Sequence, residues 1–320
     1  MATQMKAPPS SVEALAKSGP GIEVWWDSSP LIFPMWAKDT LARVADPAQR
    51  AVLAAQIDAM YDPANPGMGS IVGVTTNPPL SLQAIQRDPA TWDPWIDEQI
   101  RQQPNISKHD LFWKTYQEVV SRGAKLFQPI FEKSGYKLGY LSGQVDPRLL
   151  RDTDEMVRQG VAMNSANRNV MVKMPGTKEG IEGIRRLTAM GIPTNATLTF
   201  VLPQLLGVAQ AVMAGLAEAK AKGVDLSRWR SVCTMMLGRF EDAKPMKQQA
   251  AERGIELTES DLRWAGVAIF KKAYRIYKER GYASKMLAAS MRPGPNEGGK
   301  ARVRHVADRQ PVDRKSTRLN

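Results

Sequence analysis

The chain has 320 residues, a formal net charge of +12 and an apolar content of 43%. These values are ordinary for a globular protein, and a chain of this length buries a sizeable core without disulfides. The single cysteine, Cys233, excludes an internal disulfide, and the two histidines, His109 and His305, exclude a histidine-rich metal cluster. We find neither a run of about 18 apolar residues, as a membrane span requires, nor an apolar leader. The composition therefore favours a protein of the reducing cytoplasm with no metal and no membrane partner.

Seven short apolar runs alternate with longer amphipathic stretches, as in proteins built from β/α units. The predicted strands span residues 22–27, 70–76, 137–144, 169–174, 193–200, 231–236 and 284–290. The clearest predicted helices span residues 147–162, 177–190, 202–222 and 260–280. Seven such units predict an α/β fold of the (β/α)8 TIM-barrel type, because an open doubly wound sheet would carry a glycine-rich ligand loop that the sequence lacks.

The two ends and two long connections depart from a simple barrel pattern. Residues 1–18 are expected to form a loose N-terminal tail ahead of a barrel domain at 19–292, with extra helices within 38–61 and 91–125. After residue 292 the apolar periodicity stops, and only residues 301–306 offer an eighth strand. We therefore expect residues 293–320 to be a non-native or disordered tail, which leaves the C-terminal end of the barrel incomplete.

Polar residues follow the ends of six predicted strands, where a TIM barrel carries its reactive groups. They are Asp27, Thr75, Thr76, Asn77, Gln144, Lys173, Asn195, Thr197 and Thr234. Lys173 is the most informative, because it lies in the apolar run Val170-Met-Val-Lys-Met174. Burial favours the neutral amine, which attacks carbonyl groups and forms Schiff bases. The residues alone leave open the alternative of a lysine whose stem packs while its ammonium reaches water.

The other candidates each have a structural as well as a chemical interpretation. Asp27 is a candidate general base, although an aspartate before Ser-Ser-Pro is also typical of a turn or helix cap. The Thr75-Thr76-Asn77 segment offers groups that bind substrate hydroxyls, or forms a plain turn before two prolines. Arg239 and Arg292 follow late strands, where a guanidinium suits a phosphate dianion, or are simply solvated.

Five motifs occur in order along the chain. They are Gly73-Val-Thr-Thr-Asn-Pro-Pro-Leu80, Gln144-Val-Asp-Pro-Arg-Leu149, Val172-Lys-Met-Pro-Gly-Thr-Lys-Glu-Gly-Ile181, Gly191-Ile-Pro-Thr-Asn-Ala-Thr-Leu198 and Gly238-Arg239. Together they resemble the transaldolase family, which includes the fructose-6-phosphate aldolases, and the resemblance runs from about Glu23 to Arg292. The resemblance implies a class I aldolase barrel with no cofactor.

Family roles transfer by this resemblance to matching positions only. Lys173 matches the Schiff-base lysine and Asp27 the acid/base aspartate, while Gln144 and Thr197 would hold the water used in proton transfer. Asn77 and Asn195 match asparagines that bind substrate hydroxyls, and Thr234 falls on a family serine. The phosphate-binding arginines match Arg239 and Arg292.

Two departures concern specificity. Classical transaldolases have a glutamate where this chain has Gln144, and a glutamine amide orients a water without taking its proton. The fructose-6-phosphate aldolases have that glutamine, but they also use a tyrosine on the sixth strand, where this chain has Met235 and Met236. The long helical insertions favour the transaldolase side.

The resemblance implies a transaldolase-like transferase of the pentose phosphate pathway. It would move a dihydroxyacetone unit from sedoheptulose 7-phosphate or fructose 6-phosphate to an aldose phosphate through a Lys173 Schiff base. The alternatives are a lyase that releases dihydroxyacetone and a non-catalytic sugar-phosphate binder. The net charge also suits nucleic acid, but the sequence shows no basic stripe interleaved with aromatic residues, so sugar phosphates are the expected partners. The sequence leaves a homo-oligomer open.

Overall fold

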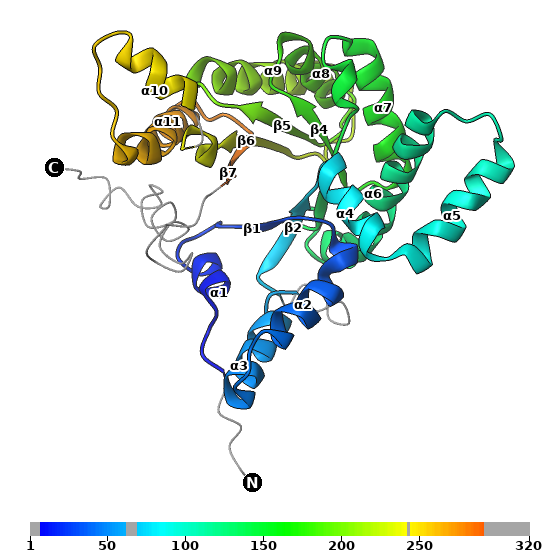
Figure 1. Cartoon of the computed structure of the whole chain (residues 1–320). Coiled ribbons are helices and arrows are strands. Elements are labelled where there is room, and N and C mark those ends of the chain that lie inside the picture. The colour runs from blue at the N-terminus through cyan, green and yellow to red at the C-terminus, as the bar shows by residue number, and fades with distance from the viewer. Residues whose placement is uncertain (1–6, 62–68, 242–243, 291–320) are drawn as a thin grey trace. The chain divides into compact units, whose positions relative to one another are not determined.

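The computed structural model describes residues 7–61, 69–241 and 244–290, which form an α/β protein (Figure 1). Seven strands belong to one sheet, and their order in the sheet follows their order in the sequence. The chain divides into two compact units, each with its own packed interior. Unit 1 comprises Met1–Lys17, Gly21–Asp146 and Gln159–Val172, and unit 2 comprises Ser18–Pro20, Pro147–Arg158 and Lys173–Asn320.

Unit 1 is built on three strands, β1 (Val24–Asp27), β2 (Ile71–Thr75) and β3 (Tyr140–Gln144), together with the first half of β4 (Val170–Pro175). The pairs β1–β2 and β2–β3 are parallel. The amide of Leu141 donates to the carbonyl of Asn169 over 3.0 Å, which brings the start of β4 beside β3. Carboxyl ends of these strands therefore point in one direction, as β/α units require.

Helices of unit 1 surround an aromatic core. They are α1 (Ser11–Ala16), the 3-10 turn η1 (Pro30–Ile32), α2 (Phe33–Ala42), α3 (Pro47–Asp58), α4 (Pro78–Arg87), α5 (Pro89–Gln102), α6 (Lys108–Lys133) and the second half of α7 (Thr153–Ala166). Trp92 of α5 is 1% exposed and packs with Ile32, Ala84 and Val119, which belong to η1, α4 and α6. The long connections thus bury their own apolar surface against the β/α framework.

Unit 2 contains the second half of β4 with β5 (Thr194–Thr199), β6 (Ser231–Met236) and β7 (Lys285–Ala289), and the pairs β5–β6 and β6–β7 are parallel. Its helices are η2 (Pro147–Leu149), the start of α7, α8 (Lys178–Ala189), α9 (Leu202–Ala221), η3 (Leu237–Phe240), α10 (Lys244–Ala251) and α11 (Glu259–Glu279). Helices α8 and α9 lie side by side along β5 (Figure 1).

Close packing of α8 on α9 depends on one glycine. A Cβ atom at Gly215 of α9 would collide with the carbonyl oxygen of Arg185 and lie 2.7 Å from Cβ of Thr188, both in α8. No side chain larger than hydrogen fits between these backbones, so the glycine sets how near the two helices come.

Helix α9 has the length and apolar composition of a membrane span. The sequence-based expectation that no stretch has this character is therefore wrong for Leu202–Ala221. Within unit 2 this helix packs on α8, β5, β6 and α11, and part of its surface is buried there. The side chain of Tyr277 in α11 donates to the carbonyl of Leu205, so one face of α9 serves as a core face.

The structure confirms each of the seven predicted strands to within about three residues at their ends, as sequence-based boundaries allow. The extra helices predicted within 38–61 are present as α2 and α3, and those predicted within 91–125 as α5 and α6, while α4 was not predicted. The N-terminal segment expected to be loose instead contains helix α1, where the Ser10 hydroxyl accepts from the amide of Glu13 and caps the first turn. The predicted eighth strand at 301–306 and the tail at 293–320 lie outside the described residues.

We predict that Gly215→Ala destabilises the protein by about 1–3 kcal/mol, because the added methyl forces α8 away from α9. Urea denaturation followed by circular dichroism measures the loss. Gly207→Ala on the same helix is the matched control, since its Cβ would meet only Cδ1 of Ile181 at 3.5 Å. This control should leave stability unchanged or raise it by up to about 1 kcal/mol, as for any glycine replaced inside a helix. Equal effects of the two changes would contradict the packing account.

Candidate functional site

Along each strand of unit 2, successive side chains point alternately to the face of the sheet that the helices cover and to the opposite face. Met174 of β4 points at α8, where its Cε lies against Gly183. Cys233 of β6 contacts Tyr277 of α11. Since neighbouring residues of a strand point to opposite faces, Lys173 and Thr234 lie on the face away from these helices.

This opposite face carries four predicted site residues of unit 2. Lys173 is 6% exposed, Asn195 0%, Thr197 4% and Thr234 2%. The hydroxyl of Thr234 donates to Oδ1 of Asn195 over 2.7 Å, which joins β5 to β6 at mid-strand. The structure therefore places the predicted nucleophile on the same face as three of its predicted partners, and it buries all four.

A bulge ends this face on β5. Leu198 has φ of 56° and is 50% exposed, and the register between β5 and β6 shifts between Ala196 and Thr199. Positive φ is uncommon for leucine and is characteristic of bulges. After the bulge, the Thr199 hydroxyl donates to the carbonyl of Thr234 over 2.6 Å and contacts Cys233 on the helix side. Two residues apart, Thr197 and Thr199 would share a face in a regular strand, but the bulge places them on opposite faces of the sheet.

Arg239 lies in η3, directly after the carboxyl end of β6, and its side chain is exposed. The turn packs on α11 at Gly266, where a Cβ would lie 2.6 Å from the carbonyl oxygen of Leu237. Because α11 holds the turn and the Arg239 side chain is exposed, the guanidinium is accessible to an anion in solution. Arg292, the second predicted phosphate ligand, lies outside the described residues.

Unit 1 places Asp27 opposite Thr75 in the parallel register of β1 and β2. Asp27 is exposed at the carboxyl end of β1, while Thr75 is 4% and Thr76 1% exposed. Asn77 caps α4, because its Oδ1 accepts from the amide of Leu80 over 3.0 Å. Asn77 is therefore a helix cap rather than part of a plain turn, and its side-chain NH2 group and the second lone pair of Oδ1 are still available for a substrate contact.

Gln144 ends β3, and its amide donates to the hydroxyl of Tyr116 in α6 over 2.7 Å. Burial raises the pKa of the Tyr116 phenol, so this hydroxyl stays protonated and accepts the bond. The preceding residue, Gly143, faces α6, because a Cβ atom there would touch Val120. Since neighbouring residues of a strand face opposite sides, the Gln144 side chain points away from that helix.

The sequence did not indicate two sets of polar contacts, the pair of Asp146 with His109 and the bonds of the Gln204 side chain, which we call the Gln204 clasp. The buried carboxylate of Asp146 lies 3.2 Å from Nε2 of His109 on α6, while the Asp146 amide donates to Gln159. Gln204 of α9 bonds to four backbone groups at the ends of β4 and β5. In the sequence Asp146 appears only as part of the motif Gln144-Val-Asp-Pro-Arg-Leu149, and Gln204 lies in no motif.

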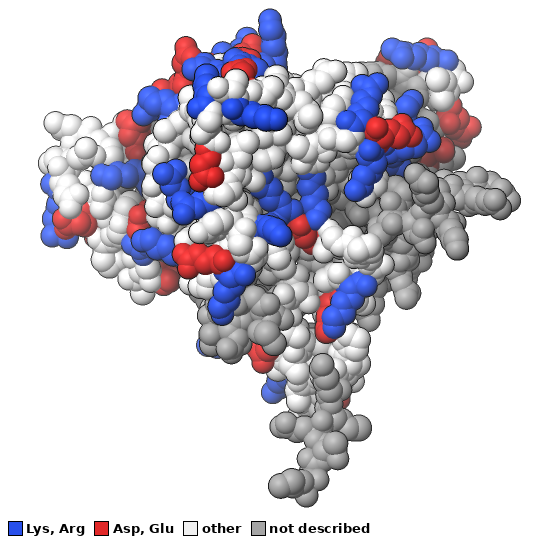
Figure 2. All heavy atoms as spheres, turned by 180° about the vertical axis from the view of Figure 1, so that it is seen from behind, with Lys and Arg blue, Asp and Glu red and all other residues white. Residues whose placement is uncertain are grey.

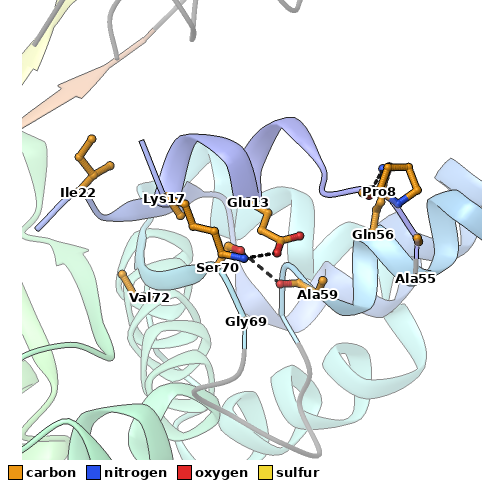
Figure 3. A pocket seen from close by; sticks show the side chains of 12 residues that line it. Pro8, Glu13, Lys17, Ile22, Ala55, Gln56, Ala59, Gly69, Ser70 and Val72 are labelled. Atoms are coloured by element: carbon orange, nitrogen blue, oxygen red, sulfur yellow. Dashed lines mark hydrogen bonds and ion pairs between the residues drawn. The ribbon is translucent and has the colours of Figure 1, made fainter. Parts of the chain in front are cut away.

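A cavity of about 550 Å³ lies elsewhere in unit 1, between α1, α3 and the start of β2 (Figure 3). Its polar groups are engaged with one another: Lys17 pairs with Glu13 at 2.6 Å, and Gln56 donates to the carbonyl of Pro8 at 2.9 Å. None of its lining residues belongs to the predicted site. The described residues contain no cluster of three or more histidine, cysteine or carboxylate side chains that would hold a metal ion.

Positive and negative side chains are interspersed on the face of the molecule drawn in Figure 2. In unit 2 several of these charges form pairs, such as Arg186 with Asp154 at 2.6 Å and Arg185 with Glu182 and Glu218. Opposite charges that lie this close screen each other, so these residues add little to the positive charge of the protein.

Comparison with known proteins identifies a family. Residues 54–296 match the family model described as transaldolase/fructose-6-phosphate aldolase. A transaldolase of Thiobacillus denitrificans is 33% identical over 227 residues, which are 68% of this chain and 61% of that protein. Transaldolases of Saccharopolyspora erythraea and of an Arthrobacter species are 33% and 34% identical over 66% of this chain. The chain spans 56% of the length of each of these two relatives.

We predict that Thr234→Val lowers the free energy of unfolding by about 1–3 kcal/mol, because it removes the buried donor to Asn195. Thr234→Ser keeps the hydroxyl and should lose less than half as much. Guanidinium denaturation of the three proteins measures both values. A valine variant as stable as the serine variant would show that the hydrogen bond contributes nothing.

We predict that Cys233 does not react with a thiol reagent at pH 8 in the folded protein. Burial raises its pKa from 9.0 to about 11, which suppresses the thiolate. The same shift means that stability present below pH 9 falls as the pH rises toward 11, since the unfolded thiol ionises first. Mass spectrometry after alkylation, with and without denaturant, checks the first point, and rapid labelling of the folded chain would refute it.

Proposed function

Because this chain belongs to the transaldolase/fructose-6-phosphate aldolase family, we propose that it is a transaldolase-like transferase that works through a Schiff base on Lys173. The observation that carries the proposal is the burial of Lys173 on one face with Asn195, Thr197 and Thr234. A buried amine favours its neutral form, which is the nucleophile that a ketone requires. The chain spans about three fifths of its relatives' length, so activity, substrates and partners of the whole protein are proposed on this basis.

In the proposed reaction the Lys173 amine adds to the C2 carbonyl of sedoheptulose 7-phosphate or fructose 6-phosphate, and loss of water gives an imine. Asp27 takes the proton of the C4 hydroxyl, the C3–C4 bond breaks, and its electron pair passes into the imine to form an enamine. The aldose phosphate leaves. The enamine then adds to a second aldose phosphate, Asp27 returns the proton, and water releases the new ketose from Lys173. Covalent catalysis in this form divides one difficult cleavage into easier steps.

The remaining site residues bind and orient. Gln144 and Thr197 hold the water that carries protons during imine formation and hydrolysis. Hydroxyl groups of the substrate bind Thr75, Thr76, Asn77, Asn195 and Thr234, and its phosphate binds Arg239 and Arg292. We further propose that the seven-stranded sheet belongs to a (β/α)8 barrel of the class I aldolase type. We also propose that the enzyme works in the pentose phosphate pathway in the cytoplasm.

Gln144 supports a second candidate, a lyase that releases dihydroxyacetone. The resemblance gives this glutamine to the fructose-6-phosphate aldolases, whereas the classical transaldolases have a glutamate at the same position. The backbone amide of Gln144 is fixed by the Tyr116 hydroxyl, which anchors the strand end that carries this side chain.

We predict that borohydride added with fructose 6-phosphate attaches a reduced three-carbon unit to Lys173, as peptide mass spectrometry will detect. Lys173→Met should abolish the adduct, while Lys178→Met, at the start of α8 outside the predicted site, should leave it unchanged. An intact, folded protein that forms no adduct would favour the non-catalytic binder. An adduct on another lysine would disprove the assignment of the nucleophile.

We predict that Gln144→Glu raises the rate of transfer relative to release of dihydroxyacetone at least severalfold, because the resemblance gives the classical transaldolases a glutamate at this position and the fructose-6-phosphate aldolases a glutamine. Product analysis with and without an aldose phosphate acceptor gives this ratio. Free dihydroxyacetone formed equally fast in both conditions by the unchanged enzyme would support the lyase instead of the transferase.

A further inference from the structure

One side chain of unit 2, Gln204, joins the ends of the two strands that carry Lys173 and Thr197. Its Nε2 donates to the carbonyl of Gly176 over 2.9 Å and to that of Leu198 over 3.3 Å. Its Oε1 accepts from the amide of Phe200 over 3.0 Å and from that of Val201 over 3.4 Å. All four partners are backbone groups at the carboxyl end of β4 or at and just beyond the bulge of β5.

These bonds coincide with the point where the regular ladder fails. The amide of Gly176 still donates to the carbonyl of Thr197 over 2.7 Å. The next residue, Leu198, takes up its positive φ and leaves the strand register. Its carbonyl and the following amides would therefore lack strand partners, and an unpaired backbone group costs free energy wherever water does not replace the bond. The Gln204 amide supplies both the donor and the acceptors that this bulge requires.

The Gln204 clasp lies close in sequence to the proposed reactive side chains of Lys173 and Thr197, so it can affect their geometry. Gly176 is three residues after Lys173, and Leu198 is adjacent to Thr197. Space around the clasp is tight, because a Cβ at Gly176 would lie 3.3 Å from Nε2 of Gln204 and 2.8 Å from Cγ2 of Thr199. A shift of either strand end would move Lys173 relative to Thr197, and misplacement by about 1 Å can cost about a hundredfold in rate.

We infer that Gln204 is a positioning residue for the Schiff-base reaction, which holds the ends of β4 and β5 so that the Lys173 amine and the Thr197 hydroxyl keep their reactive geometry. Gln204 acts through the backbone and does not touch the substrate. The inference rests on the proposed function, because it assigns a purpose to geometry around the proposed nucleophile. It predicts that chemistry is impaired more than substrate binding.

The test compares Gln204→Met, which is similar in length and removes all four bonds, with Gln204→Glu, which keeps the acceptor and removes the donors. Gln210→Met is the matched control, since Gln210 is exposed on the same helix. We expect kcat for transfer and the rate of borohydride trapping to fall at least tenfold in both Gln204 variants. KM for fructose 6-phosphate should stay within about twofold, and the control should match the unchanged enzyme.

Loss of stability must be separated from loss of position. Gly215→Ala is expected to destabilise unit 2 without touching the strand ends, so it serves as a control of comparable melting temperature. If Gly215→Ala loses as much activity as Gln204→Met at equal stability, the clasp has no positioning role. If Gln204→Met traps the adduct at the normal rate, the inference is also overturned.

A second pair of variants probes the same device when Gln204 variants do not fold. Leu198→Gly suits the positive φ and should keep kcat within about twofold, whereas Leu198→Val disfavours it and should lower kcat at least fivefold. Equal kcat values for the two would reject the inference. Failure of the unchanged enzyme to form any adduct would instead reject the proposed function, so the two failures are distinguishable.

Discussion

Burying an amine is the physical constraint around which unit 2 is organised. Lys173 lies in a strand whose six residues are all buried, and a charged ammonium in such a place is costly unless other groups compensate. The residues that share its face are polar and are themselves bonded, as the Thr234–Asn195 contact shows. Apolar residues occupy the opposite face, where α8, α9 and α11 pack. The strand therefore separates an apolar side that packs against helices from a side that carries buried polar residues.

Much of the fold was predictable because local composition and tertiary packing agree. Strands β2, β4 and β6 are short apolar runs that alternate with longer amphipathic helices, and this alternation is typical of β/α units. The N-terminal helix α1 was not predicted because six residues carry too little periodicity, although the cap at Ser10 was present in the sequence. The eighth strand has no apolar run as clear as the other seven, so the sequence supported it only weakly.

The candidate site was predictable to the extent that strand ends could be located. Lys173, Asn195 and Thr234 share a face because their strands have a period of two. The bulge at Leu198 could not be predicted, because leucine has no preference for positive φ and the conformation is imposed by neighbouring strands. The pairing of Asp146 with His109 joins residues 37 positions apart, and nothing local to either residue indicates the other. Roles in the reaction came from the resemblance to a family rather than from spacing.

The shielding of Cys233 has a practical consequence. This thiol is the only one in the chain, and it is fully buried beneath α11 with its proton retained. A cysteine introduced at any exposed position would thus be the sole readily accessible sulfhydryl, without prior removal of the native one. Fluorophores or spin labels could be attached at single chosen points, so that distances between the two units become measurable in solution.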